Sequence, residues 1–267
     1  MKPARGFPIG NHWTLFAQRT PPAAFGKVVL NECRLAWRLP VGLVLGMGLP
    51  LLLLVIFGSI PSLHKPVASL AGLTYFDVSF PVLVSLVIAI LGIVDIPSPL
   101  ATYREQGILR RLSTTPAPPA WLLAAQLVIN FAMAIAGLAI LTVVGIAAFG
   151  LDAPKSILGF VVATILSIAA VFAIGLWIAA VARTSVAAKA ISLAVLFPLL
   201  FFGGLWLPRE LMPPFLLGIS NLTPLGASVQ AIQTSMQGTF PPLSSLLVLA
   251  VYAVVFAFLG VRFFKWE

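Results

Sequence analysis

Ser156-ILGFVVATILSIAAVFAIGLWIAAV-Ala182 is a run of 27 residues without a charged side chain. A helix needs about 20 mostly apolar residues to cross the hydrocarbon core of a bilayer, so this stretch is long enough to span a membrane. The whole chain has 267 residues, of which 60% are hydrophobic and only 9% are charged. Soluble domains contain about 25% charged residues. The composition therefore predicts an all-α, polytopic membrane protein.

Working outward from this stretch, the apolar runs predict six transmembrane helices. We expect them to form a single transmembrane domain, residues 39–267, with spans at about 39–60, 74–96, 121–149, 156–182, 190–208 and 243–261.

The segment 211–240, before the last span, is uncharged but does not have the pattern of a simple span. It is interrupted by prolines and rich in Ser, Thr, Asn and Gln. Two short elements are expected, at about 214–222 and 225–237, each too short to cross. Irregular backbone at membrane depth is tolerated only against protein or water. We therefore interpret the segment as a re-entrant hairpin on the external side; the alternative is a seventh span.

The basic residues predict the topology. In the six-span arrangement, 13 of the 16 Lys and Arg residues fall on one side, and only Lys65, Lys155 and Arg209 fall on the other. Cytoplasmic loops carry an excess of basic residues, so both termini are expected in the cytoplasm. A seventh span would place Arg262 and Lys265 outside. The net charge of +9 is explained by topology, and no nucleic-acid partner is expected.

The N-terminal region contains no apolar core of a signal peptide. Residues 1–24 are expected to form a flexible cytoplasmic leader. Residues 25–38 form an amphipathic pattern in which Lys27, Arg34 and Arg38 recur on one face. Such a helix lies on the inner leaflet and binds membrane lipid, with its basic side chains reaching the headgroups. The pattern is compatible with a simple anchor and with a mechanical role.

The sequence lacks the motifs of an enzyme. It contains no GxxxxGK[ST] phosphate loop, HExxH, CxxC or GxSxG motif, and it has one cysteine and two histidines. No catalytic residue, metal site or bound cofactor is expected in this chain. Asp77 and Asp95 lie at the rims of their span, and the span interiors hold no ionisable residue. This argues against an ion-coupled carrier.

A charged segment separates the second and third spans. Ser98 and Pro99 suit the N-cap and first position of a helix, which is predicted over about 99–113. It presents Arg104, Glu105, Arg110 and Arg111 to the cytoplasm. A short charged helix between two spans suits docking onto a cytosolic partner; the alternative is a solvated interfacial loop.

Three features resemble one family. Tyr103-REQGILRRLSTT-Pro116 is similar to the cytoplasmic coupling segment of type-2 ABC exporter permeases. Gly203-GLWLPRELMP-Pro214, followed by Asn221-LTPL-Gly226, resembles the signature before the last span in that family. The N-terminal amphipathic helix also matches. The resemblance extends over roughly 25–265, and the drug-resistance branch, with its daunorubicin-type permeases, is the nearer one.

The resemblance implies the membrane subunit of a bacterial-type ABC exporter in the plasma membrane, moving an amphiphilic substrate such as a drug, lipid or glycolipid. ATP and Mg would be bound by a separate cytosolic ABC ATPase. The permease would form a dimer with a second copy or a sister permease. Two alternatives from other classes remain: a non-transporting membrane scaffold or assembly protein, and a secondary carrier.

The resemblance also implies site residues. Those expected to couple to the ATPase are Tyr103, Arg104, Glu105, Gly107, Arg110 and Arg111. We expect the Glu105 side chain to lie in water before docking, and Gly107 to tolerate bulky residues poorly if the helix packs closely at that turn. Aromatic side chains are candidates for lining the substrate path, with lipid-facing or core positions as the alternative: Phe80, Phe197, Phe201, Phe202 and Trp206.

Overall fold

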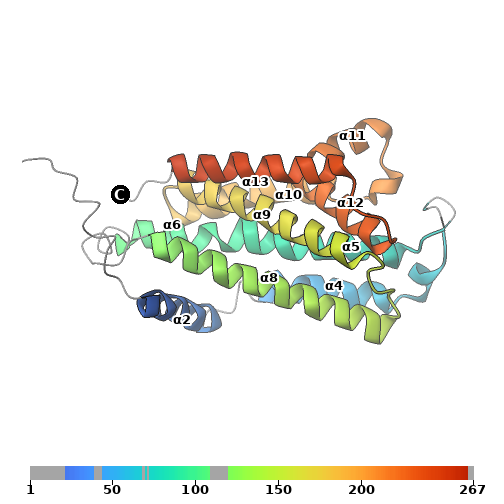
Figure 1. Ribbon diagram of the computed structural model, residues 1–267, viewed down its shortest axis with the longest axis horizontal. Coiled ribbons are helices and arrows are strands. Elements are labelled where there is room, and N and C mark those ends of the chain that lie inside the picture. Colours follow the sequence, from blue (N-terminus) through green and yellow to red (C-terminus); the bar gives the residue numbers. More distant parts are fainter. Residues whose placement is uncertain (1–21, 39–43, 68–69, 71, 109–119, 264–267) are drawn as a thin grey trace, which may run out of the picture.

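The computed structural model describes residues 22–38, 44–67, 70, 72–108 and 120–263 (Figure 1). These residues form a bundle of helices, with one isolated bridge between Pro66 and Thr74. The α-helices are α2 (Pro22–Arg38), α4 (Leu49–Gly58), α5 (Tyr75–Ala89), α6 (Pro97–Glu105), α8 (Ala120–Phe149), α9 (Ile157–Val181), α10 (Ser185–Phe202), α11 (Pro214–Leu222), α12 (Pro224–Met236) and α13 (Leu243–Phe263). Two π-helical segments, η1 (Val44–Gly48) and η4 (Ile90–Asp95), and two short 3-10 helices, η2 (Pro61–His64) and η5 (Arg209–Leu211), complete the order.

The all-helical, multi-pass prediction is confirmed. Within the described residues, five helices are long and apolar enough to cross a membrane: Tyr75–Glu105, Trp121–Phe149, Ile157–Val181, Ser185–Phe202 and Leu243–Phe263. They overlap the second to sixth predicted spans. A shorter apolar helix, Gly46–Gly58, lies at the first predicted span; residues 39–43 of that span, and residues 1–21 of the predicted leader, lie outside the described residues.

The fifth span is displaced from its predicted range, 190–208. Helix α10 begins at Ser185, where the Thr184 side chain caps it by accepting the backbone N–H of Ala187. It ends at Phe202, before Gly204, which has a φ of +92°. Hydroxyl N-caps and glycines with positive φ are the usual helix boundaries. The apolar composition alone did not reveal them, because it continues through residue 207.

Helices α11 and α12 lie where the two short elements before the last span were expected, and they meet at an angle of 94°. The segment starts and ends at the same end of the bundle, to the right in Figure 1. The Ser156 N–H, at the start of α9, donates to the Ser235 carbonyl near the end of α12 at 3.0 Å. The re-entrant hairpin stays a prediction, because a bent pair of apolar helices of this length is either a re-entrant loop or one broken span.

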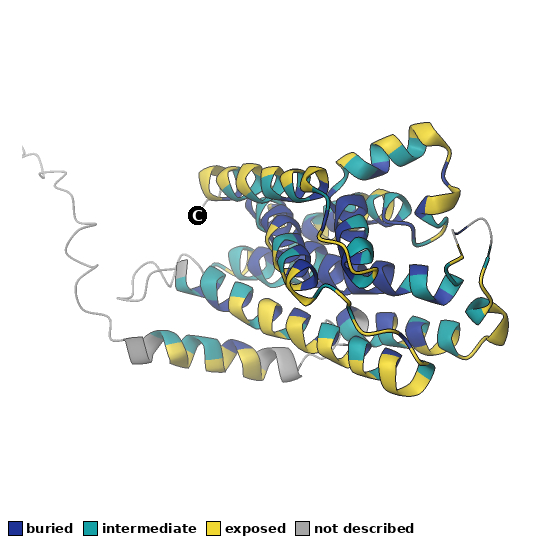
Figure 2. Ribbon diagram, turned by 45° about the vertical axis from the view of Figure 1, so that its right-hand side comes forward, coloured by how far each residue is buried: buried dark blue, intermediate teal, exposed yellow. Residues whose placement is uncertain are grey.

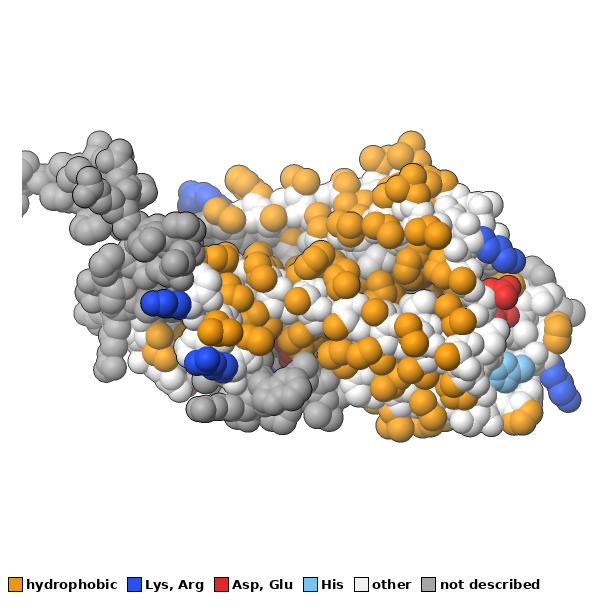
Figure 3. Space-filling view, turned by 60° about the horizontal axis from the view of Figure 1, so that its bottom comes forward, with side chains coloured by type: hydrophobic (Ala, Val, Ile, Leu, Met, Phe, Trp, Pro, Cys, Tyr) orange, Lys and Arg blue, Asp and Glu red, His pale blue; other side chains and the backbone are white. Residues whose placement is uncertain are grey.

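The core of the bundle surrounds α5 and η4, whose side chains are buried on nearly all sides (Figure 2). A helix that is apolar all round is expected at such a central position. The outer helices α8, α10 and α13 keep large apolar side chains exposed, including Val143, Phe197 and Val254, which is 70% exposed. One face shows apolar side chains over the middle and charged ones near the two ends (Figure 3). An apolar belt of this extent requires a lipid environment.

A close crossing within the core joins η4 to α9. A Cβ atom added to Gly175 of α9 would lie 1.9 Å from the carbonyl oxygen of Gly92. Small residues allow backbones in membranes to approach this closely and to gain dispersion contacts. The crossing brings α9 directly against the helix that continues into α6.

Candidate functional site

The predicted coupling helix is not an independent helix. Helices α5, η4 and α6 form one continuous helix, Tyr75–Glu105. The prediction of a separate helix over about 99–113, with Ser98 as its N-cap, is therefore wrong in its start. An α-helical Pro97 would clash with the preceding turn. The π-helical turn η4 lies immediately before it, with the Ile96 N–H bonded to the Leu91 carbonyl at 3.2 Å.

The predicted end of the coupling helix is also different. Helix α6 ends at Glu105, and Gly107 follows with a φ of +67°. A left-handed residue just past the last turn is a common helix terminator. Residues 109–113 of the predicted helix, including Arg110 and Arg111, lie outside the described residues.

The condition of close packing is not met at Gly107 in this chain. A Cβ atom added there would meet nothing within 4 Å. The glycine suits this position because its φ is in the left-handed region, which side chains with a Cβ atom disfavour.

The last three residues of α6, which we call the α6 end (Tyr103, Arg104 and Glu105), each bond a different part of the bundle. Tyr103 is directed toward α2, the predicted amphipathic helix. Its hydroxyl donates to Oε2 of Glu32 at 2.9 Å. The same oxygen accepts a bond from Nε2 of Gln126, on α8, at 2.5 Å. One carboxylate therefore connects α6, α2 and α8.

Arg104 bonds the C-terminal turn of α9. Its Nη1 atom donates to the carbonyl oxygens of Ala179 at 2.9 Å and Ala182 at 2.6 Å. Carbonyls in the last turn of a helix lack intrahelical partners, and the helix dipole makes that end negative. A guanidinium is well suited to both features. The contact joins the α6 end to the end of the fourth predicted span.

Glu105 bonds the start of the next helix. Its Oε2 atom accepts the N–H of Ser185, the first residue of α10, at 3.0 Å. The N-terminus of a helix presents unpaired N–H groups and a positive dipole end, which a carboxylate satisfies. The side chain is exposed as expected, but it is not simply in water: it is bonded to α10. Arg104 and Glu105 together place opposite charges on the two helix ends at the α9–α10 turn.

Sequence reasoning did not identify Glu32. It lies on the apolar face of α2, near Val28 and Val29, and is only 6% exposed. Burial raises the pKa of the Glu32 carboxyl, and the bonds from Tyr103 and Gln126 oppose this by lowering it. An acid on the apolar face of an otherwise basic helix was the signal available in the sequence.

The opposite face of α2 matches the prediction. Lys27 and Arg34 are exposed, and Phe25 on the other side contacts Trp121 of α8 edge to face, with ring centroids 5.8 Å apart. Arg38 is the last residue of α2, and its side chain lies outside the described residues.

At the other end of the bundle, Arg209 joins the two stretches of the predicted signature. It is 6% exposed, and its Nε donates to Oγ of Ser220 at 2.9 Å. Its guanidinium also bonds the Asn221 side chain. The neighbouring Glu210 accepts a bond from Gln233 of α12 at 2.6 Å. Burial lowers the pKa of Arg209 to about 10, opposed by the charge of Glu210, so the guanidinium stays charged at neutral pH.

We expect Arg209→Ala to destabilise the corner between α10, α11 and α12. The substitution leaves the Ser220 and Asn221 groups without a charged partner, and bonds to charged groups are worth about 1.5–3 kcal/mol each. Thermal unfolding in detergent should show a clear fall in the midpoint. The matched control is Lys155→Ala, which removes an exposed pair with Asp152 at 3.7 Å and should change little. Equal midpoints for the two variants would contradict the role of Arg209.

The five candidate aromatic residues do not form one cluster. Phe80 is fully buried in the core. Phe197 and Trp206 are each 55% exposed and stack on one another, with ring centroids 6.0 Å apart. Phe201 and Phe202 are half-buried and meet edge to face. The structure brings only Phe197 and Trp206 together on an exposed surface.

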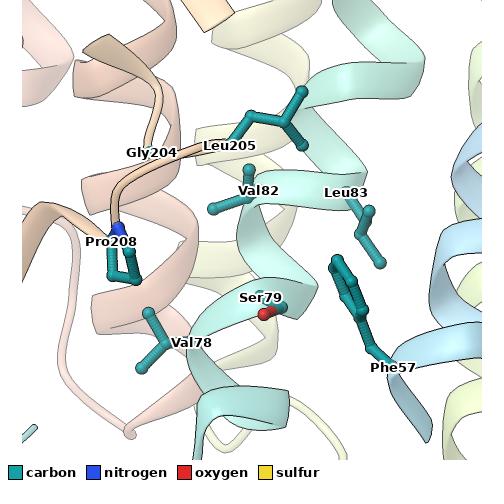
Figure 4. A pocket seen from close by; sticks show the side chains of 8 residues that line it. All are labelled: Phe57, Val78, Ser79, Val82, Leu83, Gly204, Leu205 and Pro208. Atoms are coloured by element: carbon teal, nitrogen blue, oxygen red, sulfur yellow. The ribbon is translucent and has the colours of Figure 1, made fainter. Parts of the chain in front are cut away.

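A shallow apolar pocket opens between α4, α5 and the loop after α10. It is lined by Phe57, Val78, Ser79, Val82, Leu83, Gly204, Leu205 and Pro208 (Figure 4). It contains none of the candidate aromatic residues. Among the described residues, no group of three or more His, Cys, Asp or Glu side chains could hold a metal ion.

Comparison with known proteins identifies one similarity. The family described as ABC-2 type transporter matches residues 24–237. The matched range begins within α2, contains the α6 end, and ends directly after α12. No curated protein matches the chain.

Proposed function

This chain belongs to the ABC-2 type transporter family and is a permease subunit of an ABC transporter, and from this premise we propose that it exports an amphiphilic substrate. ATP would be bound, with Mg, and hydrolysed by a separate cytosolic ABC ATPase. The observation that supports this proposal most directly is the α6 end. Its three consecutive side chains bond α2, the end of α9 and the start of α10.

The proposed coupling follows from these bonds. A displacement of the α6 end by the ATPase would move α9 and α10 with it, because Arg104 and Glu105 hold the turn between them. The two basic residues that follow in sequence, Arg110 and Arg111, are proposed to contact the ATPase surface. The side chains of the α6 end would then transmit the movement, and the residues after Gly107 would receive it.

For the substrate, we propose an amphiphile of the drug type, which would make the protein an efflux permease of the drug-resistance branch. The support is the stacked pair Phe197 and Trp206, both largely exposed on α10 and the loop after it. Exposed aromatic faces suit a flat, partly apolar ligand. The pair would face a second permease copy or a sister permease across the path.

The proposed topology places the α6 end, α2 and both termini in the cytoplasm of a bacterial-type cell, with the protein in the plasma membrane. The α6 end and α2 lie toward the left in Figure 1, at the end of the bundle opposite α11 and α12. In a Cys33→Ala background, a cysteine at position 153 should react with an impermeant maleimide only from outside. Reaction from the cytoplasmic side alone would overturn this orientation.

The decisive experiment is reconstitution with the ATPase. The chain, expressed with a phosphate-loop ATPase from the same organism, should copurify with it. Proteoliposomes holding the complex should move daunorubicin in an ATP-dependent manner. Stable association without any ATP-dependent transport would favour a scaffold, and transport by this chain without an ATPase would favour a secondary carrier.

A further inference from the structure

The interfacial helix α2 is attached to the bundle by a buried carboxylate. Glu32 is 6% exposed, although Lys27, Asn31 and Arg34 around it on the helix are exposed. Two donors from two different helices converge on its Oε2 atom: the Tyr103 hydroxyl at 2.9 Å and the Gln126 amide at 2.5 Å. Burying a carboxylate is costly unless it is hydrogen-bonded in this way. The arrangement is therefore a specific joint and not an incidental contact.

The joint is formed with the part of the bundle that the proposed function sets in motion. Tyr103 lies next to Arg104 and Glu105, whose bonds reach α9 and α10. Along the rest of its length α2 lies beside α8, where Phe25 meets Trp121 (Figure 1). The bond between Glu32 and Tyr103 links α2 directly to the α6 end.

We infer that Glu32 is a positioning residue that makes α2 move with the α6 end during transport, so that α2 is a working part of the coupling mechanism and not only an anchor. The inference rests on the proposed function. A buried polar pair sets a defined register that apolar contacts would not. A movement of the α6 end that stretched the Glu32–Tyr103 bond would expose a carboxylate to an apolar surrounding, so the two helices are expected to move together.

The test uses the complete complex of the chain with its ATPase in proteoliposomes. Tyr103→Phe removes one donor and leaves the Glu32–Gln126 bond in place, so this variant is expected to fold. Glu32→Ala removes the acceptor, and Glu32→Gln restores an oxygen that can accept from both donors. The control is Asn31→Ala, which changes the exposed neighbour of Glu32.

Two quantities are measured. The first is the number of substrate molecules moved per ATP hydrolysed. We expect this ratio to fall about fivefold in Tyr103→Phe and in Glu32→Ala. In the double variant Tyr103→Phe/Glu32→Ala it should be no lower than in either single variant, and in Glu32→Gln it should recover partly. The second is the mobility of a nitroxide label on Cys33, an exposed residue of α2 and the single cysteine of the chain. It should change when ATP binds in the wild type and not in Tyr103→Phe.

The outcomes separate the two claims. If the wild-type complex shows no ATP-dependent transport, the proposed function fails. If the wild type transports, and Tyr103→Phe keeps both the wild-type transport ratio and the ATP response of the Cys33 label, the inference about Glu32 is wrong and the proposed function stands. Should Glu32→Ala not fold, Tyr103→Phe alone decides.

Discussion

We expect Glu105→Lys to lower ATP-driven transport about tenfold, an effect within the usual range of coupling free energies between two sites. The substitution removes the carboxylate that accepts the Ser185 N–H and places an ammonium group at the positive end of α10. The α6 end then loses its bond to α10 while Arg104 keeps its bonds to α9. Substrate-stimulated ATP hydrolysis should fall together with transport.

Because Glu105 is exposed and lies outside the core, the variant should insert into the membrane and unfold at only a slightly lower temperature than the wild type. The matched control is Asp152→Lys, the same change of charge at an exposed acid in the loop between α8 and α9. It should leave transport unchanged. Glu105→Gln, which keeps an oxygen acceptor, should lie between the two. Wild-type transport by Glu105→Lys, with normal ATPase association, would exclude Glu105 from the coupling path.

Gly175→Ala should prevent the bundle from assembling normally. The added Cβ atom would lie 1.9 Å from the Gly92 carbonyl oxygen, which belongs to the backbone and has no rotamer to change. Helix α9 and η4 would have to separate, and buried side chains of α9 such as Val171 and Ile178 would lose contacts in the core. Overpacking of a core costs about 1–3 kcal/mol and occasionally more; at a backbone–backbone contact we expect the upper end, about 3 kcal/mol.

The measurement is the yield of monodisperse protein in detergent together with its unfolding midpoint. Gly218→Ala in α11 is the control, because a Cβ atom there would meet nothing within 4 Å. Removing a helical glycine at an open position should be neutral or stabilising, by up to about 1 kcal/mol. If Gly175→Ala has the midpoint of Gly218→Ala, the crossing of α9 with η4 is looser than the structure shows.

The spans were predictable because the hydrocarbon core of the bilayer requires apolar, uncharged side chains along the whole length of a helix that crosses it. Five predicted spans overlap helices of the structure, and the two short elements at 214–222 and 225–237 coincide with α11 and α12. Uncharged runs of sufficient length satisfy the hydrocarbon core, and prolines with clustered amides mark where a helix stops. These are local properties, and they can be read without knowing what each helix packs against.

The boundaries of α6 and α10 were less predictable because they depend on competing local signals. Ser98 and Pro99 favour a helix start, yet the π-turn at Ile90–Asp95 allows the helix to continue through them. For α10, the capping hydroxyl of Thr184 and the positive φ of Gly204 determine the ends, within a longer apolar run.

The sequence by itself determined the class of the protein, the positions of its long apolar helices, the two short elements before the last span and the segment that contains the α6 end. Only the tertiary structure decided what the polar residues bond. Glu32 is 71 positions from Tyr103 and 94 positions from Gln126 in the chain. Glu105 and Ser185 are 80 positions apart. Apolar burial in lipid is a property of each residue alone, whereas a hydrogen bond requires two particular groups to meet within about 3 Å, and only the packing of the helices brings them together.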